Sequence, residues 1–172
     1  MAGSLIKIDE EIVTSAVASV SLLGIDSTYD VYMVAFHNIA GSTDSQAVRT
    51  RFTVSGTADT SANYDVAQKV LRANTTFSNS SGTNDTRTLN FVTGGTATQE
   101  VANGIYYLFN FSNSSEYSFC TWELLQRDAS GNLAGSQGGG VLTVQQATDG
   151  IQFFFDSGNI TSGTFTLYGL KK

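Results

Sequence analysis

The sequence predicts an all-β protein: a single-domain antiparallel β-sandwich, jelly-roll-like, with about eight strands. Apolar and polar residues alternate in several short stretches, which is the pattern of strands with one buried face. Turn residues interrupt these stretches about every 8–12 residues, as in β-sandwiches. Charged residues make up only 14% of the 172 residues, fewer than the exposed faces of a helical protein usually carry. Eight strands in one domain of this size fit a jelly roll.

The first third of the chain predicts two long strands and a shorter one. Residues 12–23 are mostly small and β-branched, which predicts one continuous strand, turned at 24–27. Residues 29–39 (YDVYMVAFHNI) are apolar on both faces, as in a central strand that is covered on two sides. A loop at 41–45 leads to 48–54, where alternation indicates one buried and one solvated face.

The middle of the chain is less regular, with loops predicted at 56–63 and 73–87. Residues 63–71 (NYDVAQKVL) fit two structures. Apolar pairs four residues apart favour a short helix, whereas alternation favours a strand in which Gln68 is the one misfit. Both alternatives stay open. A short strand at 88–92 ends before two glycines.

The last part of the chain predicts further strands separated by turns. Residues 100–111 contain IYYLFNF, which is again apolar on both faces. Residues 128–140 are rich in glycine and are predicted to be a connection. The strands predicted here are 100–111, 116–125, 151–156 and 160–170, and residues 141–144 lead on from the glycine-rich connection.

The chain start is predicted to be an N-terminal arm, residues 1–10, preceding a β-sandwich domain at 11–172. Leu5, Ile6 and Ile8 make this segment apolar. Exposed apolar residues near a terminus are typical of an interface, so these three residues are the candidate assembly contact. The alternative is that the segment is an edge strand of its own sandwich.

Charge and composition argue against several kinds of partner. The net charge is −6 and the nine basic residues are scattered, whereas nucleic acid requires clustered cations. No apolar run approaches the about 20 residues of a membrane helix. The chain start does not have the pattern of a signal peptide, so no secretion signal is expected. The single cysteine, Cys120, lies in an aromatic stretch and is predicted to be a buried structural thiol.

No sequence pattern indicates catalysis, a cofactor or a metal, so we expect no enzyme activity. His37, the only histidine, follows the phase of its strand, and a structural role at the rim is the better interpretation. Most aspartates lie beside turn residues, where they cap the backbone. Asp26 and Asp30 lack the spacing of a calcium loop, and the glycines at 138–140 lack the lysine of a phosphate-binding loop.

Several phrases of the sequence carry a resemblance over nearly the whole chain: SLIKIDEE, GIDSTYDVYMV, NYDVAQKVLRANTTFS, SEYSF, GGGV and SGNITSGTFTLYGLKK. They resemble small virion structural proteins of tailed bacteriophages, particularly those of marine bacteria and cyanobacteria. The resemblance implies a capsid decoration or cement protein, a jelly-roll homotrimer bound to the major capsid protein. It implies no catalytic residue or cofactor, no nucleic-acid or membrane partner, and a place in the virion after assembly in the host cytoplasm.

The alternative function is a tail or tail-fibre β-domain that binds host-surface glycans. Aromatic side chains stack on sugars, and five are candidates, although most of them fall within predicted strands, where core packing is expected. These residues are Tyr29, Tyr64, Tyr106, Tyr107 and Trp122.

Overall fold

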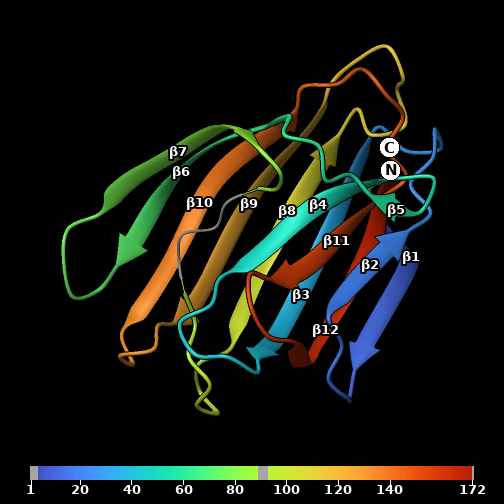
Figure 1. Ribbon diagram of the computed structural model, residues 1–172. Helices are drawn as coiled ribbons and strands as arrows, with labels where there is room; N and C mark the ends of the chain where they lie inside the picture. Colours follow the sequence, from blue (N-terminus) through green and yellow to red (C-terminus); the bar gives the residue numbers. More distant parts are fainter. Residues whose placement is uncertain (1–3, 89–92, 172) are drawn as a thin grey trace.

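Twelve strands run through residues 4–88 and 93–171, the part of the chain that the computed structural model describes (Figure 1). No helix occurs in these ranges. The strands are β1 Ser4–Val13, β2 Ser19–Leu23, β3 Val31–Gly41, β4 Val48–Val54, β5 Thr57–Ala58, β6 Tyr64–Arg72, β7 Ser78–Asp85, β8 Ala102–Phe109, β9 Ser118–Arg127, β10 Leu133–Leu142, β11 Gly150–Phe155 and β12 Ile160–Lys171.

The strands form two antiparallel sheets that face each other. The larger sheet has the order β1-β12-β3-β8-β9-β10-β6-β7, and the smaller has the order β2-β11-β4-β5. Four antiparallel pairs, β1–β12, β2–β11, β3–β8 and β4–β5, divide their eight strands equally between the two sheets. A jelly roll has this arrangement, so the predicted fold class is confirmed.

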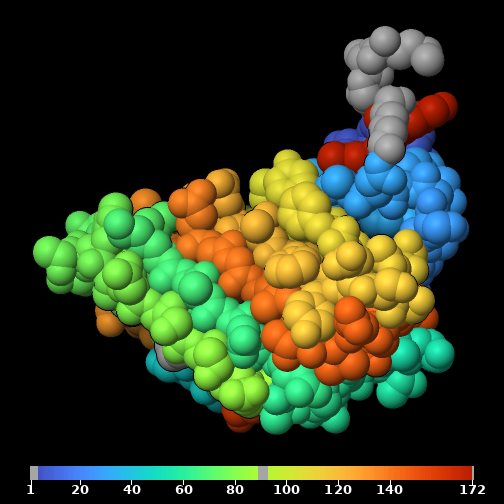
Figure 2. All heavy atoms as spheres, turned by 90° about the horizontal axis from the view of Figure 1, so that it is seen from above, coloured from blue at the N-terminus to red at the C-terminus, as the bar shows by residue number. Residues whose placement is uncertain are grey.

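The other four strands extend the larger sheet beyond the jelly roll. They lie in the order β9-β10-β6-β7, and the end formed by β6 and β7 projects from the body (Figures 1 and 2). The connection between β7 and β8 pairs with the chain beside β4: the Thr88 N–H donates to the Thr50 carbonyl and the Gly94 N–H to the Gln46 carbonyl. The count therefore exceeds the predicted eight because a further hairpin-rich region is attached to the eight-stranded core.

The core consists of aromatic side chains from both sheets. Phe36 and Phe165 from the larger sheet meet Phe153 from the smaller sheet, with ring centroids 5.6 and 5.1 Å from the Phe153 ring. Tyr106 continues the cluster to Trp122, which stacks on it at 5.7 Å. Alternation along each strand places these rings inward, and such pairs stabilise the fold beyond their buried area.

The glycine-rich stretch is a strand, so the prediction of a connection at residues 128–140 is wrong for most of its length. It lies in β10, which pairs with β9 on one side and β6 on the other. Gly138 faces inward, where a Cβ atom would come within 2.7 Å of the Trp122 ring. Glycine lowers strand propensity, but here it makes room for the largest core side chain.

For the middle of the chain, the structure decides between the two alternatives at 63–71 and differs from the loop predicted at 73–87. The stretch at 63–71 is a strand, β6 (Tyr64–Arg72), and Gln68, the misfit of the strand alternative, is buried with its neighbours Val66 and Val70. The predicted loop at 73–87 is wrong because its second half is β7. This polar edge strand is held by backbone pairing with β6 and carries no apolar pattern. In the predicted strand at 88–92, Thr88 forms a single bridge, and 89–92 lie outside the described residues.

The chain start also differs from its prediction. The expected continuous strand at 12–23 is interrupted, because β1 ends at Val13 in the larger sheet and β2 begins at Ser19 in the smaller one. The intervening residues cross between the sheets. From Ser4 onward the predicted arm at 1–10 is part of the edge strand β1, which pairs with β12 along its length. The edge-strand alternative therefore describes Ser4–Val13.

Candidate functional site

The outer face of the larger sheet is apolar at its centre. In β3 the side chains of Tyr32, Val34 and Phe36 point into the core, whereas alternate residues point away from the smaller sheet and are half-buried. The sequence predicted that β3 is covered on both sides, but within the described chain the smaller sheet covers one. We define the outer face by Val31, Met33, Ala35, Ile105, Tyr107, Phe109, Phe119 and Val141.

The strand register gathers these residues into one surface. Met33 lies opposite Tyr107, and Phe109 lies opposite Phe119, which in turn lies opposite Val141. None of the eight residues is charged. Beside them is a shallow groove of about 400 Å³, whose floor includes Gly139. On the same side of β9, Glu123 lies opposite Ile105, so the outer face is an apolar surface with a carboxylate at its border.

A second apolar surface, the end patch, lies on the same side of the larger sheet, across the neighbouring strands β9, β10 and β6. It consists of Leu71, Phe77, Leu125 and Leu133, which line a groove of about 230 Å³. Three of these side chains are at least half exposed: Phe77 by 58%, Leu133 by 55% and Leu125 by 50%. Sequence analysis missed this patch because its residues become neighbours only through the pairing of three separate strands.

Cations surround the end patch. The Lys69 ammonium group lies 5.9 Å from the centre of the Phe77 ring. Arg72 lines the groove, and its guanidinium group lies 3.8 Å from the Asp128 carboxylate. Arg127, at the end of β9, donates from Nε to the Gly131 carbonyl at 2.8 Å. The rim of this patch is therefore basic, unlike the chain as a whole.

The predicted assembly contact lies in β1, and the structure separates its three residues. Leu5 and Ile6 are exposed, whereas Ile8 is half-buried and packs against the core. Ile12, which sequence analysis assigned to the following strand, is 61% exposed on the same edge. If the end of β1 at Val13 had been known, the alternation of residues along this strand could have indicated that Ile12 is exposed.

Acidic residues accompany the apolar residues of β1. Asp9 accepts a hydrogen bond from the Leu23 N–H at 2.8 Å, and Glu11 is exposed. Glu10 pairs with Lys7 at 3.0 Å. The hydrogen bond from Lys7, and next that from Thr166, lower the pKa of Glu10, so its carboxylate stays ionised.

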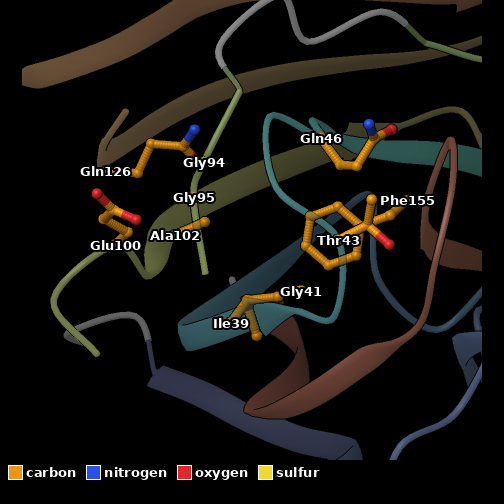
Figure 3. Close-up of a pocket in the computed structure, with 10 residues that line it drawn as sticks. All are labelled: Ile39, Gly41, Thr43, Gln46, Gly94, Gly95, Glu100, Ala102, Gln126 and Phe155. Carbon is orange, nitrogen blue, oxygen red and sulfur yellow. The ribbon is translucent and has the colours of Figure 1, made fainter. Parts of the chain in front are cut away.

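A small polar pocket lies at the other end of β3, between Ile39, Gln46, Glu100, Gln126 and Phe155 (Figure 3). Its volume of about 10 Å³ is enough for one water molecule. Gln126 is buried, and its Nε2 has no hydrogen-bond partner among the described residues, which suits such a water. Glu100 accepts from the Ala97 N–H at 3.0 Å and is the one carboxylate among the lining residues. This pocket does not present a pair of acids.

The other candidate groups for chemistry have structural partners. Asp26 accepts from the Thr28 N–H at 2.8 Å, and this bond is the largest cause that lowers the pKa of Asp26. Burial raises the pKa of the Cys120 thiol to about 12, so the thiol stays protonated at neutral pH, as predicted for a buried cysteine. His37 is exposed, with Nδ1 3.4 Å from the Asn38 amide nitrogen.

Among the described residues, no group of three or more histidine, cysteine, aspartate and glutamate side chains could hold a metal ion. In the same ranges, no helix has the length and apolar character needed to cross a membrane. The aromatic candidates for sugar stacking are mostly core residues, as expected: Tyr64, Tyr106 and Trp122 are fully buried.

Three arginines that are dispersed in the sequence converge on the smaller sheet. Arg49 Nη2 lies 2.6 Å and Arg87 Nε 3.0 Å from carboxylate oxygens of Asp156. The Arg51 guanidinium group packs on the Phe154 ring at 4.3 Å. Burial, and next the nearby charge of Arg87, lower the pKa of Arg51. These contacts bind β4, β11 and the residues after β7 to one another.

Comparison with known proteins adds no relative: no protein-family model matches the sequence, and no curated protein or solved structure resembles it significantly.

Proposed function

We propose that this chain is a viral structural protein, a capsid decoration or cement protein of a tailed bacteriophage. It binds the outside of the assembled shell as a homotrimer and stabilises the shell by burying surface between subunits. The resemblance of its sequence phrases to small virion proteins and its jelly-roll fold support this proposal. Its partners are the major capsid protein and copies of itself, and its role is mechanical, without turnover of a substrate.

The observation that carries the proposal is the apolar outer face. At about 4.8 Å between strands and about 3.3 Å per residue, the apolar residues from β3 to β10 with their neighbours on β12 span about 24 by 16 Å, or about 400 Å². Stable interfaces bury about 800 Å² per partner, with an apolar centre and a polar rim. The outer face has the size and composition of such a centre.

Purified shells that lack the protein test this function. We expect the wild-type chain to co-sediment with shells until binding saturates. Met33→Glu places a charge at the centre of the outer face, and burying that charge in an interface is expected to weaken binding at least tenfold. Circular dichroism would confirm that the variant keeps its fold.

The matched control is His37→Glu, which places the same charge on the exposed rim of the same strand. We expect this variant to bind shells as the wild type does. Absence of co-sedimentation by the wild type, or equal losses for the two variants, would contradict the proposed function.

One observation favours the alternative of a tail or tail-fibre domain that binds glycans. A groove of about 410 Å³ lies between the paired ends of β1 and β12 and the segment before β3, and it is lined by Ile6, Thr28, Tyr29, Asp30, Leu170 and Lys171. An aromatic ring beside polar groups is typical of sugar sites. Binding on a glycan array that Tyr29→Ala abolishes, together with no binding to shells, would establish this alternative.

A further inference from the structure

Besides the outer face, the larger sheet has two exposed apolar surfaces, the end patch and the edge strand β1, and the charged residues around them have opposite sign. The end patch is surrounded by Lys69, Arg72 and Arg127, with Glu123 on the same face of β9 and Asp128 paired to Arg72. Apolar contacts supply affinity at an interface, whereas the charges at its rim select the partner. A partner for this patch therefore combines exposed aliphatic side chains with carboxylates.

The edge strand β1 of the same chain has this combination. Its exposed aliphatic residues are Leu5, Ile6 and Ile12, and its carboxylates are Asp9, Glu10 and Glu11, against Lys7 and, on the adjoining strand, Lys171. One side of β1 pairs with β12, and the other side is the free edge of the larger sheet. The bulge between Lys7 and Asp9 interrupts this edge, which favours contact through side chains over addition of another strand.

The two surfaces cannot meet within one molecule. Between β1 and β10 lie β12, β3, β8 and β9, so the strands are about 24 Å apart. Figure 1 shows β1 at one end of the larger sheet and the region of β6, β7 and β10 toward the other. Complementary surfaces at opposite ends of one chain join copies head to tail; such contacts close into a ring where the rotation between copies divides a full turn, and extend as an open filament where it does not.

We propose that the edge strand β1 of one copy docks on the end patch of the next, and that three such contacts close the trimer. This inference rests on the proposed function, because it names the self-contact of that trimer. Leu5 and Ile12, which lie on one face of β1, pack against Leu71, Leu125 and Leu133 of the neighbour. Glu10, which lies on the same face, then faces Lys69 and Arg127.

The molar mass in solution, measured by light scattering after size-exclusion chromatography, tests the contact. The wild type is expected at three times the 18.3 kDa of the chain. Leu125→Asp is expected to raise the dissociation constant at least tenfold and to yield monomer at micromolar concentration. The control is Tyr117→Asp, an exposed aromatic residue in the turn before β9, which should remain trimeric.

Charge reversal provides the decisive comparison. Lys69→Glu should dissociate the trimer, as should Glu10→Lys. The chain carrying both substitutions should recover it, because the two reversed surfaces are complementary again. Recovery also shows that the variants fold.

Three results would overturn this contact: a monomeric wild type, a trimeric Leu125→Asp variant, or a chain with both charge reversals that fails to restore assembly. Shell binding separates this failure from failure of the proposed function. A monomer that still saturates shells, and loses binding through Leu125→Asp, would assign the end patch to the capsid protein instead.

Discussion

Replacing Trp122 with alanine is expected to lower the free energy of unfolding by about 3–5 kcal/mol, the typical cost of deleting a buried indole. Trp122 is 1% exposed and stacks on Tyr106. Its Nε1–H donates to the Ser136 hydroxyl at 3.1 Å, so the substitution also removes a buried hydrogen bond. Because Trp122 joins β9 to β10, its loss weakens the extension that carries the end patch.

Denaturant unfolding measures this loss, and Tyr117→Ala serves as the control. Tyr117 is an aromatic residue close to Trp122 in sequence, but it is 41% exposed. We expect its truncation to cost less than about 1 kcal/mol, as is usual for exposed positions. Similar losses for the two variants would show that Trp122 is not the centre of the packing in this region.

The second large effect is expected at Gly138, where alanine should destabilise the protein by about 2–3 kcal/mol. A Cβ atom at Gly138 would lie 2.6 Å from the Ala67 carbonyl oxygen and 2.7 Å from the Trp122 ring. Both positions are closer than atoms approach without displacement. Since the carbonyl belongs to the paired strand β6, the strain cannot be relieved by rotating one side chain.

The neighbouring glycine gives a matched control, because it lies on the opposite face of the same strand. A Cβ atom at Gly139 would meet the Cys120 carbonyl oxygen at 3.3 Å and the Thr121 methyl group at 3.9 Å. Gly139→Ala is therefore expected to cost much less than Gly138→Ala in thermal or denaturant unfolding. Equal costs would contradict the close packing of Trp122 over β10.

The strands that the sequence predicted well are those whose apolar residues alternate or fill both faces. The predicted strand at 48–54 coincides with β4, and β11 and β12 begin within one residue of prediction. The failures have other physical causes. In β10 glycine is required by a distant indole, and in β7 serine and asparagine are held mainly by backbone pairing with β6. Neither the packing of a distant indole on β10 nor the pairing of β7 with β6 can be read from the residues of those segments themselves.

The candidate site was predictable in part. Leu5 and Ile6 are exposed on an edge, as a contact requires, whereas the adjacent Ile8 packs inward because the strand bulges after Lys7. The apolar pattern of both faces of β3 indicated a second covering layer. The end patch could not be predicted, because Leu71, Leu125 and Leu133 lie on three strands whose order follows from the topology.

An averaged density map of the whole phage particle tests the central claim most directly. The account predicts jelly-roll density on the exterior of the shell, in groups of three copies around local threefold positions, with the outer face of each copy covered by protein. Density only at the tail, or copies standing singly with the outer face open to solvent, would contradict it.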